Sequence, residues 1–403
     1  MPQLSQNEIM AQKNFNLDNM VDNLDQENLP TANIIIAGVT GSGKSTLINA
    51  VFGQELARTG IGCPITDEIK KYTISEIPVC IWDTVGLEID QNHTQKSLKD
   101  IRNIIAKQTA VSDPFDRIHA VWYCISSGTH RYQGAELEFI KDLHSIGVPF
   151  IIVLTQCVRG KDDELFENEI RRINADNGMD DIETIQVLAK DYETVLGSIP
   201  SSGLERLVET TTQKLPDFIK SGFIAAQRVD VVQKRIQCEE IIMEYVRSAK
   251  AGFWDKVPLI NVLTTDRKII RMFQRIGQMY NVNLGEDNIK KITETSNVDF
   301  KNNFSGLINP IYFKYKGRVS KFLGEMQQKD GFRVEEHTFT MSERAARMIA
   351  FYGYTFVMSI EDVWGECTEE DLKKLNIMTT RLIGSINKKL DEVRRGQYGK
   401  KAQ

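Results

Sequence analysis

The pattern of apolar and polar positions divides this chain into two parts. Between about residues 32 and 190, short apolar runs alternate with amphipathic stretches of helical period. The runs have the length and composition of buried strands: NIIIAG (33–38), IKKYTI (69–74), VCIWD (79–83), RIHAVWYCI (117–125), PFIIVLT (149–155) and TIQVLA (184–189). Helical stretches at 44–52, 96–108 and 134–147 separate them, and a helix at 205–216 closes this part. Strands that alternate with helices predict a three-layer α/β domain with a mostly parallel sheet.

The second part of the chain shows helical periodicity only. We expect helices at 224–251, at 267–280, from Thr340 onward and from Glu369 towards Arg395, with a break at 254–266 and a looser region at 286–325. The pattern therefore predicts an N-terminal arm (1–30), an α/β domain (31–218) and an all-α C-terminal domain (219–403).

Composition and charge exclude several classes of protein. The 403 residues carry 50 Lys plus Arg against 55 Asp plus Glu, so there is no overall positive charge and no clear patch for nucleic acid. The six cysteines are scattered, without the spacing of a zinc site. No stretch of 18 apolar residues is present, and the first residues lack the pattern of a secretory signal. We expect a cytoplasmic protein with free thiols.

The strongest chemical signal is GVTGSGKS at 38–45, which fits G-x-x-x-x-G-K-[ST] between a predicted strand and a predicted helix. Glycines allow consecutive main-chain N–H groups to turn towards phosphates, Lys44 supplies a positive charge, and the Ser45 hydroxyl can bind Mg²⁺. The residues expected to hold the nucleotide here are Val39, Thr40, Gly41, Ser42, Gly43, Lys44, Ser45 and Thr46.

A second motif, DTVG at 83–86, follows the predicted strand VCIW. Asp83 is expected to hold Mg²⁺ through water, and the N–H of Gly86 to sense the terminal phosphate. Between the two motifs lies the loop RTGIGCPITDEI (58–69), from which one threonine should reach the metal. We expect Thr66, with Thr59 as the alternative, so the predicted metal set is Ser45, Thr66 and Asp83, and the predicted catalytic set is Lys44, Thr66 and Gly86.

Together, GVTGSGKSTLINAVFG, TGIGCPITDEIKKY and IWDTVGLE resemble the Era-like branch of translation-factor-related P-loop GTPases, in particular members with a helical C-terminal domain. The resemblance covers residues 33 to about 217 and extends more weakly into 251–282. It implies that the ligand is GTP with Mg²⁺ and that the reaction is hydrolysis of GTP.

The resemblance also implies a guanine-reading [NT]-K-x-D motif after PFIIVLT, and here the chain departs from the family. Thr155 fits, but Gln156 stands in place of Lys and Val158 in place of the Asp that would accept two hydrogen bonds from guanine. Asp162 or Asp163 could substitute, although we interpret both as the solvated start of a helix at 162–173. VLAK (187–190) is similar to the family's S-A-K, which implies that the main chain at Ala189 or Lys190 meets the purine.

Hydrolysis requires a positioned water, and the residue after Gly86 is Leu87, whose side chain cannot orient water by hydrogen bonding. We therefore expect slow turnover. The sequence supports a slow GTP-hydrolysing switch, with two alternatives: a nucleotide-binding scaffold of relaxed base specificity, or a dynamin-like membrane-associated GTPase.

The sequence does not identify a partner other than guanine nucleotide, but it offers two candidates. The helical domain is a candidate surface for a protein partner or for self-association. A peripheral membrane contact through Phe253, Trp254 and the loop around Pro258 is a second candidate, because aromatic residues between helices are unusual.

Overall fold

The computed structural model describes residues 29–53, 61–64, 69–74, 77–84, 94–130, 132, 134–195, 197–250, 258–295, 344–367, 371 and 374–395. The chain divides into two compact units, and the boundary falls between Val231 and Val232. The domain ranges expected from the sequence remain a prediction.

The first unit is built on one sheet of seven strands in the order β2-β3-β4-β1-β5-β6-β7. Its strands are β1 (Ala32–Gly38), β2 (Ile61–Pro64), β3 (Ile69–Ile74), β4 (Ile77–Thr84), β5 (Ala120–Ser126), β6 (Phe150–Thr155) and β7 (Glu183–Val187). The pairs from β4 through β7 are parallel, whereas β2 and β3 are antiparallel to their neighbours. All six predicted strands are present, and the mostly parallel sheet is confirmed. The short strand β2 was interpreted as loop, since four residues give too little alternation to indicate a strand.

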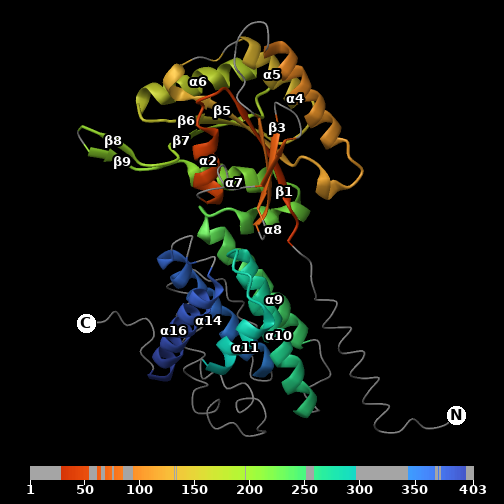
Figure 1. The fold of residues 1–403 in the computed structure, drawn as a ribbon, viewed down its shortest axis with the longest axis vertical. Coiled ribbons are helices and arrows are strands. Elements are labelled where there is room, and N and C mark those ends of the chain that lie inside the picture. Colours follow the sequence, from red (N-terminus) through yellow and green to blue (C-terminus); the bar gives the residue numbers. More distant parts are fainter. Residues whose placement is uncertain are drawn as a thin grey trace, which may run out of the picture. The chain divides into compact units, whose positions relative to one another are not determined.

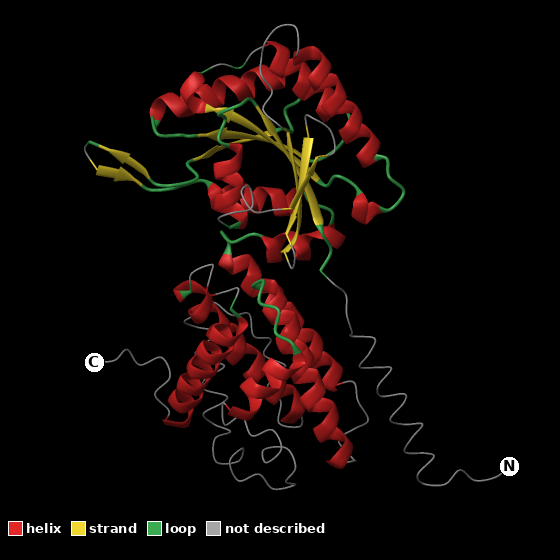
Figure 2. Cartoon of the chain, in the orientation of Figure 1, coloured by secondary structure: helices red, strands yellow, loops and turns green. Residues whose placement is uncertain are grey.

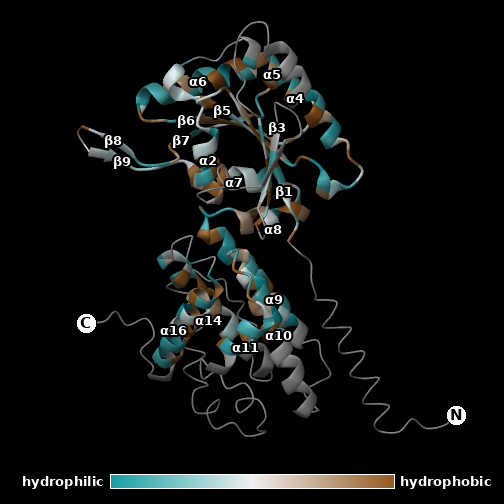
Figure 3. Cartoon of the chain, in the orientation of Figure 1, coloured by the Kyte–Doolittle hydropathy of each residue, from teal (hydrophilic) through white to brown (hydrophobic). Residues whose placement is uncertain are grey.

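Helices cover both faces of this sheet (Figures 1 and 2). One face carries α2 (Lys44–Phe52), α7 (Leu204–Lys214) and α8 (Asp217–Ala226), and the other carries α4 (Thr94–Thr109), α5 (Gly134–His144) and α6 (Lys161–Asp176). Successive side chains of a strand point to opposite faces, so Ile34 and Ile36 pack under α2 while Ile35 packs on the other side. Because both faces of the sheet are covered by helices, β5 is largely hydrophobic, whereas the outer helix α6 is largely hydrophilic (Figure 3).

Three short elements complete the first unit: the 3-10 turns η1 (Pro114–Asp116) and η2 (Ser127–Thr129), and the hairpin of β8 (Tyr192–Thr194) with β9 (Gly197–Ile199). The hairpin follows β7 and extends away from the main sheet (Figure 1). Its residues are mostly exposed and lack the apolar alternation that indicates a strand, so the sequence pattern did not predict it.

Every element described in the second unit is a helix: α9 (Val231–Lys250), α10 (Pro258–Met279), α11 (Glu286–Thr295), α14 (Arg344–Glu366) and α16 (Leu375–Arg395). Helix α14 packs on both α10 and α16. Its residues Ile349, Tyr354 and Phe356 are fully buried, and Phe356 stacks on Phe273 of α10 with 4.0 Å between ring centroids. The helical character of the C-terminal region is confirmed. None of the helices among the described residues combines the length and the apolar character needed to cross a bilayer.

The helix predicted at 224–251 is wrong as a single helix, because α8 ends at Ala226 and α9 begins at Val231. The side chain of Gln227 explains the break. This residue is fully buried, its Oε1 accepts the main-chain N–H groups of Val229 and Asp230 at 2.7 Å each, and its Nε2 donates to the Asp230 carbonyl at 2.9 Å. One side chain therefore satisfies the main-chain groups that the helix would otherwise have used.

Another helix limit also differs from expectation. Helix α10 begins at Pro258, inside the segment expected to be a break, where proline is well suited to the first helical position because its missing N–H has no partner there. Helix α16 begins at Leu375, and the helix start expected at Glu369 lies outside the described residues. The expected start at Thr340, the aromatic residues Phe253 and Trp254, and most of 286–325 lie outside the described residues.

Candidate nucleotide site

The glycine-rich segment forms a tight loop between β1 and α2. Gly41 and Gly43 have φ of 80° and 83°, a left-handed conformation that residues with a Cβ adopt at a cost. At Gly38, where φ is 144°, an added Cβ would lie 2.4 Å from the Cys124 carbonyl oxygen, so only glycine fits beside β5. The glycines of the motif are thus required by the loop's own geometry.

Lys44 lies in the first turn of α2 and folds back across the loop. Its Nζ donates to the Gly38 carbonyl at 2.8 Å and to the Val39 carbonyl at 3.2 Å, and the residue is 8% exposed. Burial lowers the pKa of Lys44 below its ordinary value, while the negative charge of Asp83 acts in the opposite direction. Since α2 has no acidic residue in its first turn, its N-terminus and Lys44 together form a site for an anion.

Asp83 reaches the same edge of the sheet because β4 lies directly beside β1. The register pairs Ile36 with Asp83, and the Thr84 hydroxyl donates to the Ile36 carbonyl at 3.5 Å. Ser45, one position after Lys44, is exposed on the first turn of α2. A hydroxyl and a carboxylate at one edge are the hard oxygen donors that Mg²⁺ prefers, so these residues fit the metal.

Other predicted residues of the loop have different surroundings. Ser42 is fully buried, and its hydroxyl has no hydrogen-bond partner among the described residues. Thr40 and Thr46 are exposed, and Val39 is half-buried against the apolar core. The predicted Thr66 and Gly86, the alternative Thr59, and Leu87 lie outside the described residues.

The end of β6 is attached to the phosphate loop by two side chains. The Thr155 hydroxyl donates to the Ser42 carbonyl at 2.6 Å. Gln156, which has φ of 58°, donates from Nε2 to the Gly41 carbonyl at 3.1 Å and accepts from the Ser126 hydroxyl at 2.8 Å. The structure therefore brings these two predicted residues together with the 38–45 loop.

Asp163 is not the solvated residue that the sequence suggested. It is 1% exposed, its Oδ1 accepts a hydrogen bond from the Ser127 hydroxyl, and its Oδ2 accepts from the Arg159 N–H at 2.6 Å. The interpretation was wrong because the partner Ser127 lies 36 residues earlier in the chain, in the turn η2 directly after β5. Asp162 is exposed at the start of α6, as expected.

Ala189 and Lys190 follow β7 at the same edge of the sheet. Leu188 exchanges both main-chain hydrogen bonds with Ser202 at 2.9 Å, and the Cys157 N–H donates to the Val187 carbonyl at 3.3 Å. The bond from Cys157 holds the segment after β6 beside the end of β7, and the bonds between Leu188 and Ser202 hold the segment after β7 beside the residues that precede α7. Ala189 is half-buried and Lys190 is exposed.

A mostly parallel sheet with a glycine-rich loop between its central strand and a helix defines a P-loop nucleotide-binding domain. Comparison with known families refines this class. Residues 33–156 match the family model described as 50S ribosome-binding GTPase, so this part of the chain has the fold of a P-loop GTPase G domain.

Individual relatives are distant. The chain is similar to neuronal-specific septin-3 from Rattus norvegicus, with 25% identity over 195 residues that cover 41% of this chain and 53% of the relative, and to the Homo sapiens protein, with 24% identity over 195 residues, 41% of this chain and 53% of the relative. The chain thus spans about half of the length of these curated relatives.

Solved structures show limited similarity. A probable GTP-binding protein engB has 17% identity and a TM-score of 0.33, covering 45% of this chain and 97% of that one. A single-residue variant of Aquifex aeolicus Era, bound to GDP.AlF4-, has 14% identity and a TM-score of 0.31, covering 56% of this chain and 69% of that one.

Proposed function

We propose that this protein binds GTP with Mg²⁺ at the 38–45 loop and hydrolyses it slowly, as a molecular switch. The observation that carries the proposal is the position of Lys44, whose Nζ lies over the loop at 2.8 Å from the Gly38 carbonyl, at the N-terminus of α2. A terminal phosphate placed there meets a cation and several main-chain N–H groups, and these stabilise the charge that develops during attack by water.

Within this proposal, Ser45 and Asp83 would hold Mg²⁺, together with the predicted Thr66, and the metal would supply positive charge to the phosphates. Gly86 senses the terminal phosphate. Leu87 supplies no hydrogen bond to the attacking water, which makes turnover slow. We also expect that the protein belongs to the Era-like branch and is cytoplasmic. We further expect a protein partner or self-association through the helical domain, and a peripheral membrane contact.

Calorimetric titration tests the binding step. GTP, ATP and a non-hydrolysable GTP analogue are titrated with Mg²⁺ into the wild type, into Lys44→Ala and into the control Lys141→Ala. Lys141 is on α5, where it pairs with Glu138 on the surface. We expect GTP binding by the wild type and the control, and loss of at least about tenfold in affinity in Lys44→Ala, because a charge-assisted contact to phosphate is lost. Equal affinity of the two lysine variants would remove the proposed phosphate site.

A nucleotide-binding scaffold with little turnover is the second candidate, and the departures at Gln156 and Val158 favour it. Release of phosphate from GTP under single-turnover conditions separates the two candidates. Hydrolysis that is lost in Lys44→Ala supports the switch, whereas tight binding without phosphate release supports the scaffold.

A further inference from the structure

The ends of β5, β6 and β7 lie on the side of the phosphate loop away from Asp83. The sheet order places β1 between β4 and β5, so the metal-binding edge and the β6 edge flank the loop. Thr155 and Gln156 contact the loop carbonyls of Ser42 and Gly41. If phosphates occupy the loop, as the proposed function states, the base extends along the segments that follow β6 and β7.

Purine bases differ in the groups that such a site can read. Guanine has a carbonyl oxygen at position 6 and an amino group at position 2, whereas adenine has an amino group at position 6. Hypoxanthine, the base of ITP, keeps the 6-carbonyl oxygen and lacks the 2-amino group. A protein distinguishes GTP from ITP only if an acceptor, best a carboxylate, meets the 2-amino group.

Two carboxylates that follow β6 and β7, those of Asp163 and Asp191, already hold other groups. Asp163 is buried between the Ser127 hydroxyl and the Arg159 N–H, and turning it towards a base would leave both donors without this acceptor, the Ser127 hydroxyl in a fully buried place. After β7, Asp191 accepts the Ser201 N–H at 2.8 Å. Both acidic side chains therefore serve to fix the loops of the site.

Gln156 and Val158, which directly follow β6 or lie close after it, supply no substitute acceptor. Both ends of the Gln156 amide are used, by Ser126 and by Gly41, and Val158 presents only an apolar side chain, half-buried. The main chain after β7 supplies donors instead. Among the residues that the structure describes, none accepts a hydrogen bond from the N–H of Ala189 or Lys190.

We propose that the base site, where the resemblance implies that the main-chain N–H groups of Ala189 or Lys190 meet the purine, does not read the 2-amino group of the base. The inference rests on the proposed function and specifies its substrate class: 6-oxopurine nucleotides, with GTP and ITP bound alike and ATP more weakly. A donor facing the adenine 6-amino group is left unsatisfied, which lowers affinity.

Competition of GTP, ITP and ATP against a fluorescent GDP analogue on the full chain tests this inference. In the wild type we expect GTP and ITP affinities within about threefold of each other and ATP weaker by about tenfold, the worth of one hydrogen bond. Val158→Asp should raise the preference for GTP over ITP to roughly 10–100-fold, because a carboxylate then meets the 2-amino group. Val158→Asn, which adds a neutral acceptor, should give a smaller preference.

Thermal unfolding of each variant shows that it is folded, and Asp162→Asn is the matched control, since Asp162 is one of the two exposed acids, with Glu164, in the first turn of α6. A wild-type preference for GTP over ITP of more than about tenfold overturns the inference, and its loss in Asp162→Asn would identify the carboxylate that reads guanine. Equal affinity for ATP overturns the main-chain recognition. A folded Val158→Asp variant without a gain for GTP overturns the placement of the base beside residue 158. If the protein binds none of the three nucleotides, the proposed function is wrong and this inference is wrong with it.

Discussion

At the scale of single residues, Gly203 shows how closely two segments of the G domain approach each other. It precedes α7 with φ of 79°, and an added Cβ would lie 1.9 Å from the Gln186 carbonyl oxygen of β7. Gly178, after α6, has a similar φ of 73°, but no atom lies within 4 Å of an added Cβ. Comparing alanine substitutions at these two glycines therefore separates the free-energy cost of backbone strain from the cost of a steric clash.

Gly203→Ala is expected to lower the free energy of unfolding by about 3 kcal/mol or more, since strain and overpacking add. Gly178→Ala should cost about 1 kcal/mol, from strain alone. Urea denaturation of both variants measures the difference. Equal losses would show that β7 and the start of α7 move apart easily.

His119 also joins two segments that are distant in the chain, because its ring connects β1 to η1. The ring is 3% exposed, Nδ1 accepts the Asn33 N–H at 2.9 Å, and Nε2 lies 3.0 Å from the Pro114 carbonyl, to which it donates. Burial lowers the pKa of His119 below its ordinary value, and the bond to Pro114 offsets part of this effect. The folded state thus favours the neutral ring.

A lowered pKa in the folded state means that the unfolded chain takes up the proton first as the pH falls. The stabilisation by neutral His119 is therefore complete above the unfolded pKa of about 6.5 and is lost as the pH falls below it. We expect His119→Gln, which keeps a donor and an acceptor without titrating, to cost about 1 kcal/mol at a pH of about 7.5 and less at a pH of about 5.5. Urea denaturation at both pH values measures the two costs, and a cost that grows at low pH would contradict the assignment.

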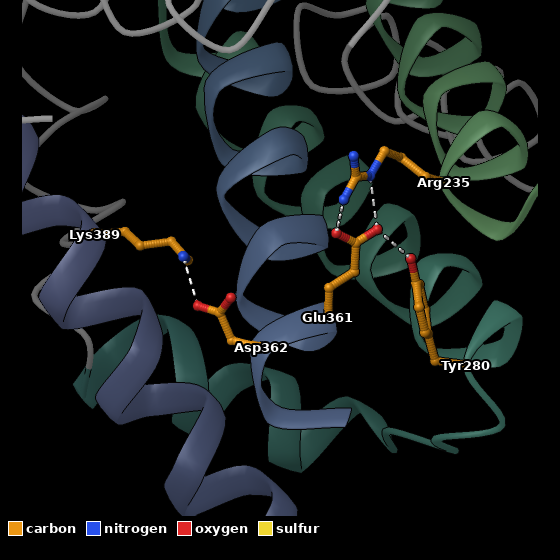
Figure 4. Close-up of polar contacts among 5 residues, drawn as sticks. All are labelled: Arg235, Tyr280, Glu361, Asp362 and Lys389. Atoms are coloured by element: carbon orange, nitrogen blue, oxygen red, sulfur yellow. Dashed lines mark hydrogen bonds and ion pairs between the residues drawn. The ribbon is translucent and has the colours of Figure 1, made fainter. Parts of the chain in front are cut away.

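At the scale of elements, a cluster of polar side chains joins three helical segments of the second unit. The Glu361 carboxylate of α14 accepts from Arg235 of α9 at 2.9 and 2.5 Å and from the hydroxyl of Tyr280, directly after α10, at 2.9 Å (Figure 4). The Glu361 side chain is 12% exposed. The neighbouring Asp362 pairs with Lys389 of α16 at 2.6 Å, but its side chain is 53% exposed.

Glu361→Gln is expected to lower the free energy of unfolding of the second unit by about 2–4 kcal/mol, because the guanidinium of Arg235 stays partly buried without a carboxylate. Asp362→Asn should cost at most about 1 kcal/mol, since its ion pair is accessible to water. Circular dichroism in the far ultraviolet during thermal unfolding compares the two. Similar shifts in Tm would mean that Glu361 contributes no more than a surface pair.

At the scale of the whole molecule, the chain has two compact units, and the proposed nucleotide site lies entirely in the first. A ligand that binds only the folded state stabilises the unit that contains its site. Differential scanning calorimetry with GDP and Mg²⁺ at about 100 times the Kd should shift the transition of that unit upward by about 5–10 °C, equivalent to about 2.7 kcal/mol. Lys44→Ala should abolish the shift, and a shift retained in this variant would place the ligand elsewhere.

The sequence by itself determined the features that depend on local pattern. The six longer strands of the main sheet follow from apolar runs bounded by polar residues, and the phosphate loop follows from glycines whose φ only glycine adopts cheaply. The parallel sheet then follows from the alternation of strands and helices, and with it the meeting of Lys44 and Asp83 at one edge. Most helices of the second unit were found in the same way, from their apolar stripes.

Only the tertiary structure decided the features that depend on contacts between distant residues. The partner of Asp163 is 36 residues away, that of the Gln156 amide is 115, and that of Glu361 is 126. The break at Gln227 was hidden because its buried amide replaces helical hydrogen bonds that an apolar stripe does not reveal. The physical reason is the same in each case: a periodic pattern records which face of an element is buried, whereas the partner of a polar atom depends on which elements the fold places beside it.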